Sequence, residues 1–157
     1  MKLPLDGGCR CDEVRFRVTE APLITSACHC NGCQRMSSSA FSLTAICEAA
    51  SFTVTRGEPV IGGLHDPEQQ HFFCPRCMTW MFTRIPAYPG IVNVRATLFD
   101  DHAWFTPFME TFTKTKLPWV RTEAVRSFEE FPPPEAFESL MREYAARNAF
   151  HLDDTRR

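Results

Sequence analysis

The chain has 157 residues, of which 44% are hydrophobic and 23% charged, and this composition suits one globular domain with a modest core. The 17 basic and 19 acidic residues give a formal net charge of -2 and are interspersed, which argues against a nucleic-acid partner. No apolar run approaches the roughly 20 residues of a membrane-spanning helix, and the first residues lack the apolar stretch of a signal peptide. We therefore expect a soluble, cytoplasmic protein with no membrane partner, and we assign no oligomeric state.

Short strands dominate the predicted secondary structure. Alternating or short apolar runs predict strands at residues 14–18, 24–29, 41–47, 52–55, 71–73, 78–84, 90–94 and 104–109. After three prolines at 132–134, apolar residues recur at helical spacing and predict an amphipathic helix from Glu135 to about Phe150. The pattern predicts a mainly β domain over residues 1–131, followed by a C-terminal helical extension over residues 132–157 that packs on or near it.

Seven of the eight cysteines lie in three short motifs, a C-x-C, a C-x-C-x-x-C and a C-x-x-C. A reducing compartment disfavours structural disulfides, so tight thiol clusters favour metal binding, and two thiolates of a C-x-x-C can converge on one ion. Cys47 stands alone on an apolar strand face and is expected to be a small buried hydrophobe.

Seven clustered thiols are enough for two zinc ions per chain, one held by four cysteines and one by three. A structural zinc takes four protein ligands, whereas a reactive zinc keeps one position open. The predicted structural site, which we call the outer cluster, consists of Cys9, Cys11, Cys74 and Cys77. The predicted catalytic site, which we call the inner cluster, consists of Cys28, Cys30 and Cys33. An open thiolate-bound zinc can stabilise a substrate thiolate or polarise a carbonyl oxygen, and both suit the addition of a thiol to an aldehyde.

Several alternatives remain open at this point. All seven cysteines could hold zinc for folding only, with His29 or His71 as the fourth ligand of the inner site. Alternatively, Cys30 and Cys33 could form a redox pair. His29 lies between two predicted ligands on an extended segment, so its side chain should point away from them. Arg35 could hold a substrate carboxylate or could be a solvated surface residue.

The three cysteine motifs, in this order, resemble those of the glutathione-dependent formaldehyde-activating enzyme family. The likeness runs from about Gly8 to Trp119 and rests on Gly8-Cys9-Arg10-Cys11, Cys28-His29-Cys30-Asn31-Gly32-Cys33-Gln34-Arg35, Ser39-Ala40-Phe41, Phe73-Cys74-Pro75-Arg76-Cys77, Leu98-Phe99-Asp100-Asp101 and Leu117-Pro118-Trp119.

This resemblance implies a β-tent fold of short antiparallel strands, a structural zinc on the outer cluster and a catalytic zinc on the inner cluster. It also implies the joining of glutathione to formaldehyde to give S-hydroxymethylglutathione, with carbon–sulfur lyase activity in the reverse direction. The family shares its domain with centromere protein V, which suggests an alternative function as a non-catalytic, zinc-binding module for protein interactions.

The chain departs from the family pattern at two kinds of position. Members often have glycine after the second cysteine of each outer pair, where this chain has Asp12 and Met78, and this concerns turn geometry only. His71 stands where family members often have a basic residue. Residues 96–101, Ala-Thr-Leu-Phe-Asp-Asp, replace a tighter Gly-Thr-Leu-Asp-Asp of the family. Both changes could reshape the pocket. The identity of the thiol and of the aldehyde is therefore not fixed by the resemblance.

Overall fold

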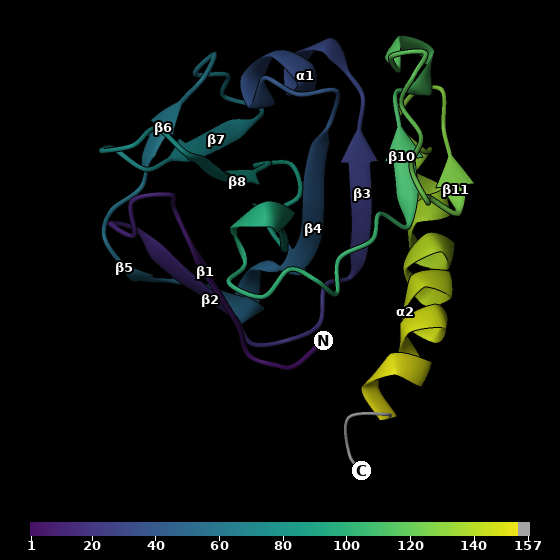
Figure 1. The fold of residues 1–157 in the computed structure, drawn as a ribbon, viewed down its shortest axis with the longest axis horizontal. Helices are drawn as coiled ribbons and strands as arrows, with labels where there is room; N and C mark the ends of the chain where they lie inside the picture. The colour runs from purple at the N-terminus through teal and green to yellow at the C-terminus, as the bar shows by residue number, and fades with distance from the viewer. Residues whose placement is uncertain (154–157) are drawn as a thin grey trace.

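The computed structural model describes residues 1–153, with side chains as far as Asn148, and it contains two β-sheets and a long C-terminal helix (Figure 1). The smaller sheet is antiparallel, in the order β1-β2-β5, and comprises β1 (Leu5–Gly8), β2 (Arg15–Val18) and β5 (Phe52–Arg56). The larger sheet has the order β11-β10-β3-β4-β9-β8-β7-β6.

The strands of the larger sheet are β3 (Ile24–Cys28), β4 (Ser42–Glu48), β6 (Val60–Gly62), β7 (Gln70–Phe73), β8 (Trp80–Arg84), β9 (Ile91–Arg95), β10 (Met109–Thr111) and β11 (Arg126–Ser127). The helices are α1 (Asn31–Ser37) and α2 (Phe137–Asp153), with short 3-10 turns η1 (Ala49–Ser51), η2 (Ala96–Leu98), η3 (Thr113–Thr115) and η4 (Pro134–Ala136). The prediction of a mainly β fold with short strands and a C-terminal helix is confirmed.

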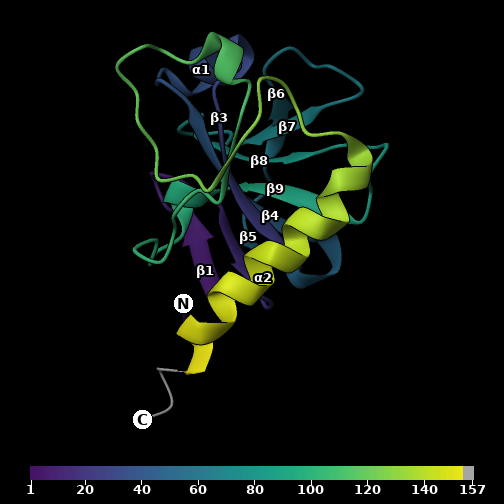
Figure 2. The same ribbon diagram turned by 90° about the vertical axis from the view of Figure 1, so that its right-hand side faces the viewer.

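Strand β4 separates two hydrophobic cores because its successive side chains point to opposite faces. Ala45 and Cys47 face the core between the two sheets, which also contains Phe16 of β2 and Phe82 of β8. Ile46 faces the second core, where Leu140 and Tyr144 of α2 pack with Ile24, Phe108 and Met109. Figure 2 shows α2 lying across this side of the molecule. The strands β3 and β4 are therefore covered on both faces.

The segment before β10 differs from its prediction. A strand was expected over residues 104–109, but β10 begins only at Met109. Pro107 lacks the N–H that a strand ladder requires, and the backbone of Phe105 bonds instead to His102 in a turn. Strand β10 then pairs in parallel with β3 and with β11, so this edge of the sheet is not antiparallel as expected.

Strands β1, β6 and β11 and helix α1 were not predicted. Strand β1 contains two consecutive glycines, so its apolar pattern is too sparse to show, and α1 is a seven-residue helix too short for a helical period. The C-terminal helix follows the 3-10 turn η4 and begins two residues later than expected. The division into residues 1–131 and 132–157 stays a prediction, and residues 154–157 lie outside the described part of the chain. Among the described residues, no helix is long and apolar enough to cross a membrane.

Candidate metal centres

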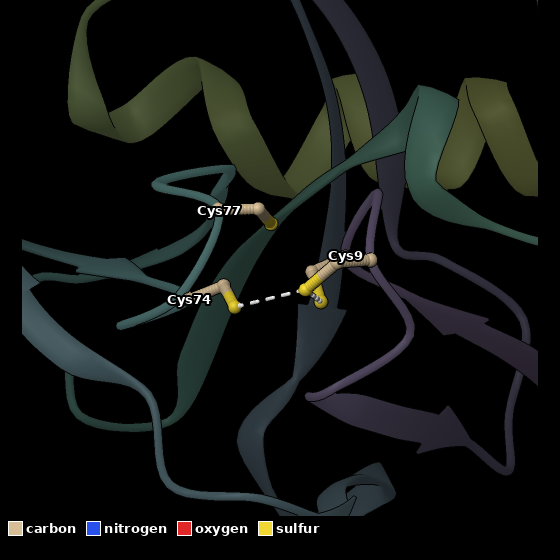
Figure 3. A group of neighbouring side chains, drawn as sticks. Cys9, Cys74 and Cys77 are labelled. Atoms are coloured by element: carbon tan, nitrogen blue, oxygen red, sulfur yellow. Dashed lines mark hydrogen bonds between the residues drawn. The ribbon is translucent and has the colours of Figure 1, made fainter.

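The outer cluster brings together two loops that are more than 60 residues apart in sequence. Cys9 and Cys11 come from the loop between β1 and β2, and Cys74 and Cys77 from the loop between β7 and β8. Figure 3 shows the side chains of Cys9, Cys74 and Cys77 directed into the space between these loops. The Sγ atoms of Cys9 and Cys11 are 3.6 Å apart, those of Cys11 and Cys74 are 3.8 Å apart, and all four lie within 4.8 Å of one another.

These separations fit one metal ion. Sulfurs placed about 2.3 Å from a tetrahedral zinc lie roughly 3.8 Å from each other, far beyond the roughly 2.05 Å of a disulfide. All eight cysteines belong to the described residues and all are free thiols. The outer cluster could therefore hold a metal ion that links the three-stranded sheet to the end of the larger sheet.

Both outer turns are closed by the residues that follow their second cysteine. The N–H of Asp12 donates to the carbonyl of Cys9, and the N–H of Met78 donates to the carbonyl of Cys74, each at 3.0 Å. Asp12 has a φ of 63° and Met78 a φ of 55°, so both lie in the left-handed region that favours glycine. The two departures from the family pattern therefore affect turn geometry, as expected, and each places a side chain in a strained backbone conformation.

The inner cluster lies where β3 ends and α1 begins. Cys28 is the last residue of β3, Cys30 is the N-cap of α1, and Cys33 lies in its first turn, where its N–H donates to the Cys30 sulfur at 3.3 Å. The three sulfurs lie within 4.8 Å of one another, and each residue is half-buried. Within the described residues, this group contains no fourth Cys, His, Asp or Glu ligand.

The inner thiols affect one another's ionisation. Contact with Cys28, and then with Cys33, lowers the pKa of the Cys30 thiol. The same crowding raises the pKa of Cys28, through Cys30, and the pKa of Cys33, through Cys28 and Cys30. Without a cation, one thiolate is favoured at the expense of its two neighbours. A bound metal would allow all three to ionise together, so the donor set fits a metal with an open position.

His29 lies between Cys28 and Cys30 in sequence and anchors this segment to the protein interior. Its ring is fully buried, its Nε2 lies 3.1 Å from Glu110 Oε2, and its Nδ1 has no protein partner. The carbonyl of His29 accepts hydrogen bonds from Gln34 Nε2 at 2.7 Å and from Thr115 Oγ1 at 2.9 Å. The side chain therefore points away from the cysteines, as expected, and it does not belong to the inner metal group.

Glu110 is the centre of a buried polar network that the sequence interpretation missed. Its carboxylate accepts hydrogen bonds from Lys116 Nζ at 2.6 Å, Ser127 Oγ at 2.7 Å and Thr122 Oγ1 at 2.8 Å, besides the contact with His29. Burial raises the pKa of Glu110, but hydrogen bonds, from Lys116 first, outweigh this and lower it to about 2. The sequence offered one signal for this network: Glu110 is a single acidic residue directly after the apolar Met109 and directly before Thr111.

The remaining candidates have distinct positions. Cys47 is fully buried in the core, and burial raises the pKa of its thiol to about 12, so it is separate from both clusters, as expected. His71 donates or accepts a 2.8 Å hydrogen bond with Thr83 and joins neither metal group. Arg35 is exposed and lines an open hollow of about 680 Å³ beside α1, together with Gln34, Ser38, Ser39, Ala40, Phe41 and Trp119.

Comparison with known proteins places this architecture among related sequences. The model of the family described as glutathione-dependent formaldehyde-activating enzyme matches residues 4–115. A Halomonas elongata protein provisionally named as such an enzyme is 27% identical over 129 residues, which cover 76% of this chain and 82% of that protein.

One solved structure shares the fold. A crystal structure of a Rhodobacter sphaeroides protein superimposes with a TM-score of 0.51 at 20% identity and covers 60% of this chain and 87% of its own. At this level of identity, the likeness concerns the fold alone. It shows that the fold of the matched 60% of this chain occurs in another protein.

Proposed function

Because the chain belongs to the glutathione-dependent formaldehyde-activating enzyme family, we propose that it is a zinc-dependent carbon–sulfur lyase-like enzyme. Its proposed substrates are a thiol such as glutathione and a small aldehyde such as formaldehyde, which it joins into an S-hydroxymethyl adduct or releases from one. The observation that carries the proposal is the inner cluster, in which three half-buried sulfurs converge and leave room for one more ligand.

In this proposal the two clusters have different tasks. The outer cluster, Cys9, Cys11, Cys74 and Cys77, would hold a structural zinc, and the inner cluster, Cys28, Cys30 and Cys33, a catalytic one. The number of ligands supports this division, because four sulfurs can close the shell of a tetrahedral zinc, whereas three leave one position open. When bound at the inner cluster, the metal would favour the ionised form of a thiol or polarise a carbonyl oxygen.

The proposed reaction balances without a redox partner. The thiol loses its proton, its sulfur forms a bond to the aldehyde carbon, and the electron pair of the C=O π bond moves to the oxygen, which takes up one proton. The reverse reaction breaks the same carbon–sulfur bond and returns the thiol and the aldehyde. No electron is gained or lost overall, so no external oxidant or reductant is needed.

The chain's own residues would fix the inner cysteines in place. Gln34 Nε2 donates to the carbonyls of His29 and Thr115 at 2.7 and 2.9 Å, which ties the first turns of α1 to the loop after β10. His29 is fully buried and contacts Glu110, so it supports this loop from inside the protein. The open hollow beside α1 is our proposed place for the body of a thiol substrate. Its wall includes Gln34 and Arg35, which directly follow Cys33, and Trp119, but none of the three inner cysteines.

The experiment is a direct assay of adduct formation from glutathione and formaldehyde by the zinc-loaded protein. The Cys30→Ser variant should lose the activity while remaining folded, because it removes an inner ligand outside the buried core. Cys47→Ser is the matched control, since it replaces a cysteine that belongs to neither cluster. We expect the control to retain activity.

A different outcome would favour the alternative function. If wild type carries two zinc ions and shows no thiol-adduct activity with any small aldehyde, the enzyme assignment fails, and a non-catalytic zinc module for protein interactions becomes the better account. The free state of all eight thiols supports the further proposal that the protein works in a reducing, cytoplasmic compartment.

A further inference from the structure

A row of polar side chains crosses one face of the larger sheet and leads to the inner cluster. The registers pair His71 with Thr83, Thr83 with Asn93, Arg95 with Thr44, and Ser42 with Cys28. Directly opposed residues, and residues two apart on one strand, share a face of a sheet. We name this polar row His71, Thr83, Asn93, Arg95, Ser42 and Cys28.

The middle of the polar row is buried although it is polar. Thr83 and Ser42 are buried and Arg95 is only 7% exposed, while His71, Asn93 and Cys28 are half-buried. The alternate residues of β9, Val92 and Val94, point to the other face and belong to the core between the sheets. Polar groups lose hydration when they are buried, so this face has a use other than packing.

Arg95 is the charged member of the row. Its Nη1 donates to Ser42 Oγ at 3.2 Å, its Nη2 donates to the Asn93 carbonyl at 3.3 Å, and its guanidinium lies over the ring of Trp80 at 4.1 Å. Two buried side-chain atoms of the row, Arg95 Nε and Asn93 Oδ1, have no partner in the protein. Among the described side chains, Arg95 forms no ion pair with a carboxylate, unlike Arg15, Arg17 and Arg126.

The negative charge that faces Arg95 belongs to the inner cysteines. Burial lowers the pKa of Arg95 to about 10, and negative charge on Cys33 and Cys28, which a bound metal would bring by ionising them, acts in the opposite direction. Arg95 therefore keeps its charge at neutral pH. The Ser42 hydroxyl, which accepts the bond from Arg95, also contacts the Cys33 thiol.

We propose that Arg95 is a specificity-determining residue that makes the inner cluster select an anionic sulfur ligand, the thiolate of the substrate. Three thiolates and one zinc dication carry a net charge of minus one, so an added thiolate would meet repulsion. A buried guanidinium beside the cluster offsets that repulsion and favours the thiolate over neutral ligands such as water. This inference rests on the proposed function, because it assigns the ligand of the same inner site.

The test is calorimetric titration of zinc-loaded protein with glutathione and, separately, with 2-mercaptoethanol, which carries no carboxylate. In Arg95→Gln, affinity for both thiols should fall by about tenfold to a hundredfold, the range for one lost charge-assisted interaction. Arg95→Lys keeps the charge but loses the planar fork that bonds Ser42 and Asn93 and the stacking on Trp80, so its affinity should fall less than that of Arg95→Gln and stay within about tenfold of wild type. Arg84→Gln is the matched control, because Arg84 also lies over aromatic rings but contacts Phe52 and Phe82 instead.

The zinc content of every variant is measured alongside. If Arg95→Gln loses its metal, Arg95→Lys provides the test instead. A large loss of thiol affinity in Arg95→Lys at full zinc content would then overturn the charge-based role. Unchanged binding in Arg95→Gln would also overturn it, as would a loss confined to glutathione, which would indicate recognition of a carboxylate. Wild type that binds neither thiol would instead refute the proposed function itself.

Discussion

At the scale of single residues, the two outer turns carry backbone strain that substitution can remove. Met78 has a φ of 55° and a side chain that is 59% exposed, so glycine there would lose little packing and gain a relaxed backbone. We expect Met78→Gly to raise the free energy of unfolding by about 1 kcal/mol in a denaturant titration. Arg76→Gly in the same loop is the control and should destabilise, because Arg76 is not among the residues with positive φ. A less stable Met78→Gly protein would contradict this.

Glu110 is a second residue whose substitution should change the free energy of unfolding. Its pKa in the folded protein is about 2, below the ordinary value of 4.5, so ionisation stabilises the fold above pH 4.5 and this contribution disappears as the pH falls toward 2. Glu110→Gln should therefore lower the free energy of unfolding by about 2 to 3 kcal/mol at pH 7. The difference from wild type should narrow below pH 4.5.

The matched control for this variant is Glu130→Gln, which removes an exposed carboxylate that pairs with Lys114. Exposed ion pairs contribute about 0 to 1 kcal/mol, so the control should be nearly as stable as wild type. Acid also weakens thiolate metal sites, but it does so in every variant. A pH-independent difference between wild type and Glu110→Gln would refute the assigned role.

At the scale of elements, α2 is expected to be part of the folded unit rather than an appended tail. Leu140 and Tyr144 are buried against Ile24 and Phe108, and the Tyr144 and Phe108 rings lie 5.7 Å apart. Leu140→Ala should lower the free energy of unfolding by about 2 to 4 kcal/mol, in one cooperative transition. Arg142→Ala, at an exposed position of the same helix, should change it by less than about 0.5 kcal/mol. A separate early transition for the helix would show that it folds independently.

Elements with a clear alternating pattern were predictable from the sequence, and those formed by long-range pairing were not. Strand β9 illustrates both cases. The alternation of Val92 and Val94 predicts a strand, whereas the residue that pairs with Arg95 depends on which strand lies beside β9. The cysteine spacing was sufficient to group all seven thiols as the structure does. The parallel pairing of β10 with β3 carries no local signal, and it is this pairing that brings Glu110 to His29.

At the scale of the whole molecule, the two clusters relate differently to the fold. The outer cluster joins the β1–β2 loop to the β7–β8 loop and so connects the two sheets, whereas the inner cluster lies within one continuous segment from Cys28 to Cys33. A metal clip across a long stretch of chain reduces the conformational freedom of the unfolded protein far more than one across a short stretch. Loss of the outer metal should therefore affect the entire domain, and loss of the inner metal only its surroundings.

Zinc content per chain, from elemental analysis of wild type and Cys28→Ser, followed by titration of each with glutathione, decides whether the seven cysteines form two different zinc sites. We expect about two zinc ions in wild type and about one in the variant, with the variant still folded and only wild type responding to glutathione. One zinc ion in wild type, or two in the variant with an unchanged response to glutathione, would contradict this division.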